Sequence, residues 1–287
     1  MGTSSAFGGA AGTTPLVPSW LDAEEEDPDG SAPPDEPSDD EDEPAPPVRP
    51  PFPPPGDPAR FTAARGNFSR FAKSGGADGA SLGRAVSQYV GTSSGGAAGA
   101  AAHMGSSRRA GSRLLGFLGD AVRNGAAAAL RTLNLEALAG RPIEEIFLGL
   151  ADYICPQGGT VDEGIAREAF IETIAELAQA GVTDLDGLTA DQMQTVFELF
   201  ATNAIEARLC NDIGLNAVTL PGDTREAAQV QAQLHDFIVR GVADALTVAG
   251  VTVQAMTPDR ALAVVDRAYQ EAFGILQSMG DAAAAAA

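Results

Sequence analysis

Apolar side chains recur every three to four residues along much of the chain after Ser107. This spacing places them on one face of an α-helix and predicts a series of amphipathic helices. The positions expected to face the core are Leu114, Phe117, Leu118, Ala121 and Val122; Ile143, Ile146, Phe147 and Leu150; Ala166, Phe170, Ile174 and Leu177; Val196, Phe197, Phe200 and Ala204; Val230, Leu234, Phe237, Ile238, Val242 and Leu246; and Leu262, Val265, Tyr269, Phe273 and Leu276. Strand patterns are weak, with 217–220 as the one candidate, so the sequence predicts an all-α, bundle-like domain.

Polar residues mark where several of these helices begin and end. Thr160 with Glu163, and Thr189 with Gln192, have the spacing of a capping box, in which two side chains satisfy free backbone N–H groups at a helix start. Gly181 follows the last apolar position of the first of these helices and predicts its end.

The pattern divides the chain into five segments. Residues 1–20 form a tail of small residues, and residues 21–58 are acidic and then proline-rich. Residues 59–105 combine basic, aromatic and Gly/Ser-rich stretches with one short helix over 81–90 and a glycine-rich hinge over 91–99. Residues 106–280 carry the helical domain, and residues 281–287 are expected to fray. Charge repulsion and proline content predict that 21–58 is disordered and extended, with a reach on the order of 100 Å.

Charge is distributed unevenly along the 287 residues, whose formal net charge is −21. Residues 22–43 are densely acidic without Lys or Arg, whereas 49–141 contain an excess of basic residues. Such neighbouring blocks suit either self-masking or a partner of complementary charge. No apolar run approaches the ~20 residues that span a bilayer, and no signal peptide is evident, so we expect a cytoplasmic protein.

Residues with catalytic or metal-binding chemistry are few. The two histidines, His103 and His235, belong to no His/Cys cluster with metal-ligand spacing, and Cys155 and Cys210 fit buried thiols better than a disulfide. His235-Asp236 resembles a metal phosphohydrolase dipeptide but lacks the further histidines that such a site needs. Neither a P-loop nor a nucleophile elbow is present. We therefore expect no enzyme activity, no catalytic residues, no metal and no cofactor.

The segment from Phe61 to Lys73 alternates aromatic and basic residues. We predict that Phe61, Arg65, Phe68 and Arg70, with Tyr89 further along, contact a partner protein or the rest of this chain. Stacking on bases with charge contacts to phosphate is the alternative, although the adjacent acidic block would compete with phosphate.

The N-terminal tail carries its own candidate site. Pro15 and Pro18 favour extended geometry around Leu16 and Val17, and these two residues with Trp20 could occupy a groove, either on a partner or on this protein's own helices.

Gly2 is the second candidate in the tail. A small second residue permits removal of Met1, which would leave Gly2 as the amino terminus. An α-amino group has a pKa near 7.7–8.0, so a minority is neutral and nucleophilic near pH 7. Thr3 and Ser4 offer hydroxyl groups for recognition without bulk. The tail can therefore be the substrate of another enzyme, or simply an unstructured start.

Two parts of the sequence resemble QatB proteins, components of the four-gene Qat anti-phage defence system of bacteria. The first is the opening MGTSSAFGG with TPLVPSW at 14–20. The second is LGRAVSQYVGTSSGGAAG at 82–99 with HMGSSR at 103–108. The helical region resembles the family more loosely.

The resemblance implies partners. The family occurs with an ATPase (QatA), a QueC-like enzyme (QatC) and a TatD-like nuclease (QatD). Enzymes like QueC activate a 7-deazaguanine carboxylate with ATP and let ammonia attack it. A QueC-like defence enzyme could instead accept the amine of Gly2, with Thr3 and Ser4 seating the tail and the helical domain docking QatC.

Three hypotheses follow. In the first, the protein is a non-enzymatic defence component whose N-terminus QatC recognises or modifies. In the second, it is an unmodified helical scaffold that assembles the ATPase and the nuclease. In the third, it is a nucleic-acid-binding adaptor that uses 61–73.

Overall fold

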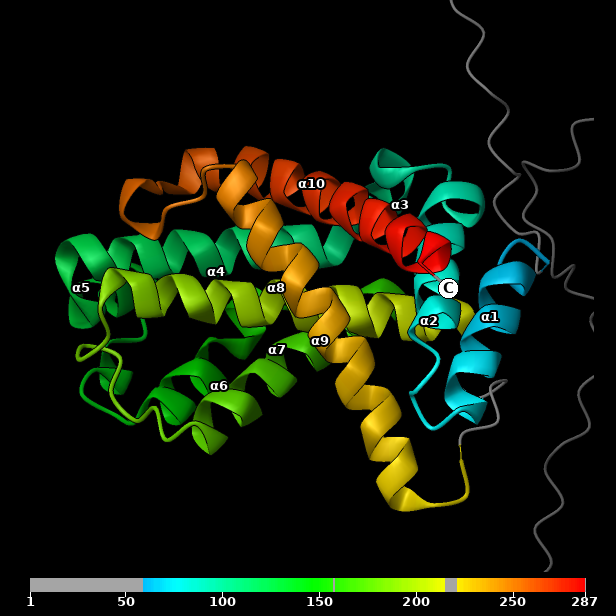
Figure 1. Ribbon diagram of the computed structural model, residues 1–287. Helices are drawn as coiled ribbons and strands as arrows, with labels where there is room; N and C mark the ends of the chain where they lie inside the picture. Colours follow the sequence, from blue (N-terminus) through cyan, green and yellow to red (C-terminus); the bar gives the residue numbers. More distant parts are fainter. Residues whose placement is uncertain (1–58, 157, 215–220, 287) are drawn as a thin grey trace, which may run out of the picture. The chain divides into compact units, whose positions relative to one another are not determined.

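The computed structural model describes residues 59–156, 158–214 and 221–286, which fold into helices joined by short connections (Figure 1). No β-strand occurs among these residues, so the all-α prediction is confirmed. The candidate strand at 217–220, the tail at 1–20 and the acidic linker at 21–58 lie outside the described residues.

The helices follow one another with few long connections. Their bounds are α1 Thr62–Lys73, α2 Gly79–Gln88, α3 Ala97–Ala102, α4 Gly105–Asn124, α5 Ala126–Thr132, α6 Ile143–Ile154, α7 Val161–Gln179, α8 Ala190–Ile213, α9 Thr224–Val248 and α10 Pro258–Ala285. A π-helical turn, η1 (Tyr89–Ser93), continues α2, and two 3₁₀ turns, η2 (Glu136–Leu138) and η4 (Val253–Ala255), lie between longer helices.

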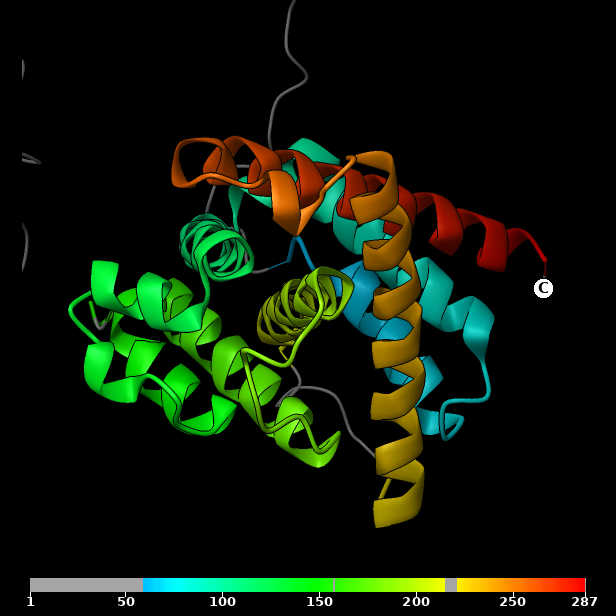
Figure 2. The ribbon, with the colours of Figure 1, turned by 90° about the vertical axis from the view of Figure 1, so that its left-hand side faces the viewer.

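Helix α8 lies in the middle of the helical unit. Figure 2 looks almost along it and shows α4, α7 and α9 around it, and all three pack against it. Six consecutive residues, 200–205, are all buried, so α8 is covered on every side there. A helix buried on so much of its surface organises its neighbours, because each must place its own apolar face against it.

Helix α10, the last helix, packs against helices from the beginning of the described chain. It packs against α2, α3, α4 and α9 (Figure 1). Where it crosses α2, glycine meets glycine: a Cβ added at Gly83 would lie 2.7 Å from the carbonyl oxygen of Gly280. The two backbones approach this closely only because neither residue has a side chain.

The core is continuous from Phe61 to Leu276. Residues 59–105, which the sequence analysis separated from the helical domain, share this core with it. Phe61 stacks on Tyr89 with ring centroids 5.6 Å apart, and Tyr89 lies 6.4 Å from Phe273 of α10. On the other side of the core, Phe170 stands edge-on to Phe200 at 6.2 Å.

The predicted capping boxes are confirmed. The Thr160 side chain accepts a hydrogen bond from the Glu163 backbone N–H, and Glu163 accepts one in return. Thr189 and Gln192 form the same pair at the start of α8. Gly181 has φ 71° just after α7 ends.

Two predictions about α10 differ in the structure. Leu262 is 46% exposed, because Ala261 and Val265 take the inward positions at the start of α10 and residue 262 faces away from them. Residues 281–285, expected to fray, continue α10. They are held there by contact with α2, where the Ser87 hydroxyl donates a hydrogen bond to Asp281.

The glycine-rich stretch 91–99 is more ordered than a hinge. Residues 91–93 belong to η1, and residues 97–99 begin α3. The turn itself is confined to residues 94–96, and the φ values of 78° at Gly95 and 89° at Gly96 favour glycine.

Candidate functional site: a buried charge network and an acidic groove

A network of charged and polar groups ties the start of α4 to α7, α8 and η1. The carboxylate of Asp162 accepts hydrogen bonds from the Ser106 backbone N–H at 2.7 Å and from Arg208 Nη1 at 3.2 Å. Arg208 Nε donates to Asp212 at 3.0 Å, and the Tyr89 hydroxyl donates to the same Asp212 oxygen at 3.0 Å. Four elements therefore meet through these five residues.

The charges of this network compensate one another. Asp162 lies in the first turn of α7 and also caps α4, so it faces the positive ends of two helices. The Asp212 side chain is only 6% exposed, and Arg208 supplies the charge that allows it to be buried. Burial and the charge of Asp212 raise the pKa of Tyr89, so its hydroxyl remains protonated and donates.

His103 lies beside this network at the end of α3. Burial and the charges of Arg60 and Arg208 lower the pKa of His103, which favours the neutral ring at pH 7. Its Nδ1 atom is buried without a hydrogen-bond partner among the described residues. The two stretches that resemble QatB proteins, 82–99 and 103–108, thus supply Tyr89, His103 and Ser106 to one junction between helices.

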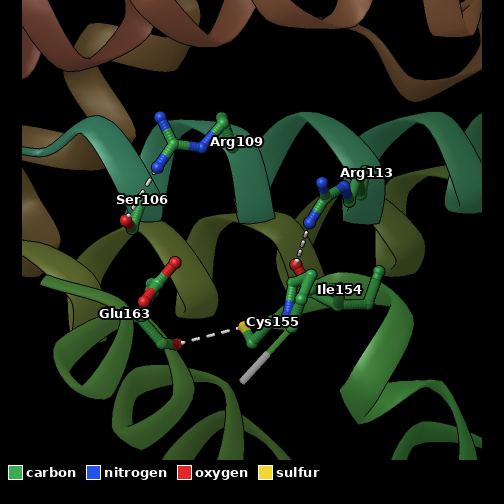
Figure 3. Close-up of a pocket in the computed structure, with 8 residues that line it drawn as sticks. Ser106, Arg109, Arg113, Ile154, Cys155 and Glu163 are labelled. Atoms are coloured by element: carbon green, nitrogen blue, oxygen red, sulfur yellow. Dashed lines mark hydrogen bonds between the residues drawn. The ribbon is translucent and has the colours of Figure 1, made fainter. Parts of the chain in front are cut away.

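A small pocket lies between α4, the end of α6 and the start of α7 (Figure 3). It has a volume of about 80 Å³, well below the ~300–1,000 Å³ of typical ligand sites. Arg109 donates to Ser106 Oγ at 3.0 Å, and Arg113 donates to the Ile154 carbonyl at 3.3 Å, so each guanidinium serves a local contact. Burial raises the pKa of Cys155 to about 12, which keeps the thiol neutral and unreactive.

A larger groove of about 500 Å³ lies between α7, α8 and α9. Its small side chains come one from each helix: Ala169, Ala207 and Ala232. The charged residues around them are mostly acidic, namely Glu168, Glu172 and Glu176 on α7, Glu206 on α8, and His235 and Asp236 on α9. This acidic groove brings seven titratable side chains together, because Cys210 also lines it.

His235 and Glu206 form an ion pair inside the acidic groove. His235 Nδ1 lies 2.9 Å from a Glu206 carboxylate oxygen. The hydrogen bond to Glu206, opposed by burial, raises the pKa of His235. Burial also raises the pKa of Glu176, whose carboxylate is half-buried. The groove therefore holds more carboxyl groups than cations, and the burial of one of them, Glu176, disfavours its charged form.

Cys210, His235 and Glu206 line one groove, which suggests a nucleophile, a base and an orienting carboxylate. The electrostatics oppose this chemistry. Burial, with the charges of Glu206 and Glu168, raises the pKa of Cys210 to about 12. An activated thiol requires the opposite shift.

Neither a metal centre nor a membrane-spanning helix is found within the described ranges. No group of three or more His, Cys, Asp and Glu side chains there has the geometry to hold a metal ion. No helix among those same residues is long and apolar enough to cross a bilayer. His235-Asp236 is thus a histidine paired with Glu206 beside an exposed acid.

The predicted site residues between Phe61 and Tyr89 differ in burial: the aromatic ones lie in the core, whereas the basic ones reach the surface to different degrees. Phe61, Phe68 and Tyr89 are buried in the core, so neither a partner nor a nucleic acid base reaches their rings in this fold. Arg65 is half-buried and donates from Nε to the Ile213 carbonyl at 2.6 Å, at the end of α8. Arg70 is exposed.

The remaining predicted site residues lie outside the described residues. They are Gly2, Thr3 and Ser4, and Leu16, Val17 and Trp20.

Two sites escaped the sequence analysis. The acidic groove has a readable signal, since Glu168, Glu172 and Glu176 recur at four-residue spacing on one helix face. The charge network has no such signal in the sequence, because Asp162 and Arg208 are far apart along the chain and meet only after α7 and α8 pack.

Comparison with known proteins relates the chain to a family. The family model described as "Qat anti-phage system associated protein QatB" matches residues 95–276, more than half of the chain. Neither a curated protein nor a solved structure matches.

Proposed function

The chain belongs to the QatB family of the Qat anti-phage system, and we propose that it is a non-enzymatic component that binds the QueC-like enzyme QatC and presents its N-terminus to it. Family membership gives the protein a role in the Qat system. The binding of QatC by the helical unit, and the use of Gly2 as an acceptor after Met1 removal, are the proposed steps.

The family match is the observation that carries the proposal, and the chemistry of Gly2 supports it. In the conjugation step, the neutral α-amino nitrogen of Gly2 would attack the activated carboxyl carbon of a 7-deazaguanine. A C–N bond forms, the bond to the ATP-derived leaving group breaks, and the nitrogen loses its proton. An α-amino group is suited to this because more of it is neutral at pH 7 than of a lysine amine.

The mass of the N-terminal peptide tests the proposal. The full-length protein is purified from three expressions: with QatC, without QatC, and with a QatC variant that does not turn over ATP. We expect a mass gain confined to Gly2 only when QatC and ATP are both present. A Gly2→Pro variant, which replaces the primary amine, should show no gain.

The opposite result would favour the scaffold hypothesis. If Gly2 is unmodified, or Met1 retained, in a complex that protects cells from phage, conjugation is excluded. The scaffold hypothesis further expects Gly2→Pro to be tolerated and Trp20→Ala to impair assembly with the ATPase QatA and the nuclease QatD.

A further inference from the structure

The acidic groove between α7, α8 and α9 differs from the other charged parts of the described chain. Elsewhere, carboxylates in ion pairs meet arginine: Asp162 and Asp212 meet Arg208, Asp266 meets Arg108, and Asp152 meets Arg167. The carboxylates that line the groove have no arginine or lysine partner within the described residues. The one ion pair among them is that of Glu206 with His235.

This arrangement opposes the stability of the free protein. Glu168, Glu172 and Glu176 stand at four-residue spacing on α7, and like charges at that spacing destabilise a helix. Glu206 and Asp236 add negative charge from the facing helices. A cationic surface placed in the groove would relieve this repulsion.

The shape of the groove restricts what can supply that surface. Three helices border it, its volume is about 500 Å³, and alanines from all three helices leave space between the acidic side chains. A helix docked into a groove makes its contacts through one face. Side chains at i and i+4 share such a face, which is the spacing of the glutamates of α7.

We propose that the acidic groove is the docking site for a basic amphipathic helix of a partner protein. Small apolar side chains of that helix contact Ala169, Ala207 and Ala232, and its arginine or lysine side chains pair with the glutamates of α7 and with Glu206. This interaction goes beyond the proposed role of Gly2 and does not depend on it.

The probe for this docking is a labelled 18-residue helical peptide with an alanine and leucine face and three arginines at four-residue spacing. Its matched control carries glutamine in place of the three arginines. Fluorescence anisotropy with the full-length protein should show that the arginine peptide binds and that the glutamine control does not. Because exposed charges contribute, affinity should fall as salt rises from 50 to 150 mM but remain measurable.

A pair of variants locates the binding. Glu172→Gln with Glu206→Gln should weaken binding at least about tenfold, because two facing carboxylates are lost. Glu136→Gln with Glu144→Gln changes the net charge equally at exposed positions outside the groove and should leave affinity unchanged. A photo-reactive residue in the peptide should cross-link to α7, α8 or α9.

Several outcomes would overturn the proposal. These are equal weakening by both variant pairs, cross-links spread over the whole surface, or no binding at 150 mM salt. Equally tight binding of free spermine with the same variant sensitivity would assign the groove to small polycations instead. Self-association of the protein that the groove variants abolish would assign it to a second copy of this chain. The mass of the N-terminal peptide is unaffected by any of these results, so the two proposals fail separately.

Discussion

At the scale of single residues, Asp162 gives a prediction about stability. It caps α4 from another helix and pairs with Arg208. Asp162→Ala removes both contacts and leaves Arg208 with one partner. We expect the free energy of unfolding to fall by about 2 kcal/mol, measured by urea denaturation.

Asp152→Ala is the matched control. Asp152 also pairs with an arginine, Arg167, but its side chain is 76% exposed. Solvent screens that pair, so the loss should stay within about 0.5 kcal/mol. Equal losses for the two variants would show that the network around Arg208 contributes no more than a surface ion pair.

His235 gives a pH-dependent prediction. Its pKa is raised in the folded state, chiefly by Glu206, so the charged ring stabilises the fold. This stabilisation is fully present below the unfolded pKa of about 6.5 and is lost as pH rises through the folded pKa. His235→Gln should therefore destabilise the protein more at pH 5.5 than at pH 8.5, by up to about 1 kcal/mol.

Denaturant titrations of the wild type and His235→Gln at both pH values measure this difference. A destabilisation that is the same at pH 5.5 and pH 8.5 would show that His235 acts by packing alone.

At the scale of helices, the crossing of α2 and α10 depends on two glycines. Gly83→Ala would place a Cβ 2.8 Å from the Ala283 side chain and 2.7 Å from the Gly280 carbonyl oxygen. Backbone atoms cannot yield as a flexible side chain can, so the helices must separate. We expect a loss of about 1–3 kcal/mol in the free energy of unfolding.

Gly164 provides the control for Gly83. It also lies within a helix, α7, but a Cβ there would meet no atom within 4 Å. Gly164→Ala should stabilise the protein by about 0.5–1 kcal/mol, because alanine favours the helix. If both alanine variants stabilise, the close approach of α2 and α10 is not required by the fold.

The helices also show how far the sequence alone could predict this structure. Long helices with regular apolar faces and capping boxes, such as α7 and α8, were predictable because local signals agree with the tertiary packing. Helix α1 was missed, although Ala64, Phe68 and Phe71 have helical spacing, because the basic residues among the aromatics suggested a binding segment. The acidic groove and the charge network depend on contacts between distant helices, which apolar periodicity does not specify.

At the scale of the whole molecule, the fold and the proposed acceptor site occupy separate parts of the sequence. The core runs from Phe61 to Leu276, so deletion of residues 1–7 removes none of its residues. We expect this deletion to leave the melting temperature unchanged and to abolish protection against phage. Thermal denaturation and plaque counts measure the two effects, and retained protection would contradict the proposed role of Gly2.

The packing of α10 against α2 also has a consequence for biosynthesis. Ser87 and Asp281, which bond across this contact, are 194 residues apart. At about 5–20 residues per second, roughly 10–40 s of translation separate them. During that interval the apolar face of α2 is not yet covered by α10. Exposed apolar surface of this kind favours chaperone binding and aggregation. The amino terminus has emerged long before, so removal of Met1 can precede closure of the helical unit.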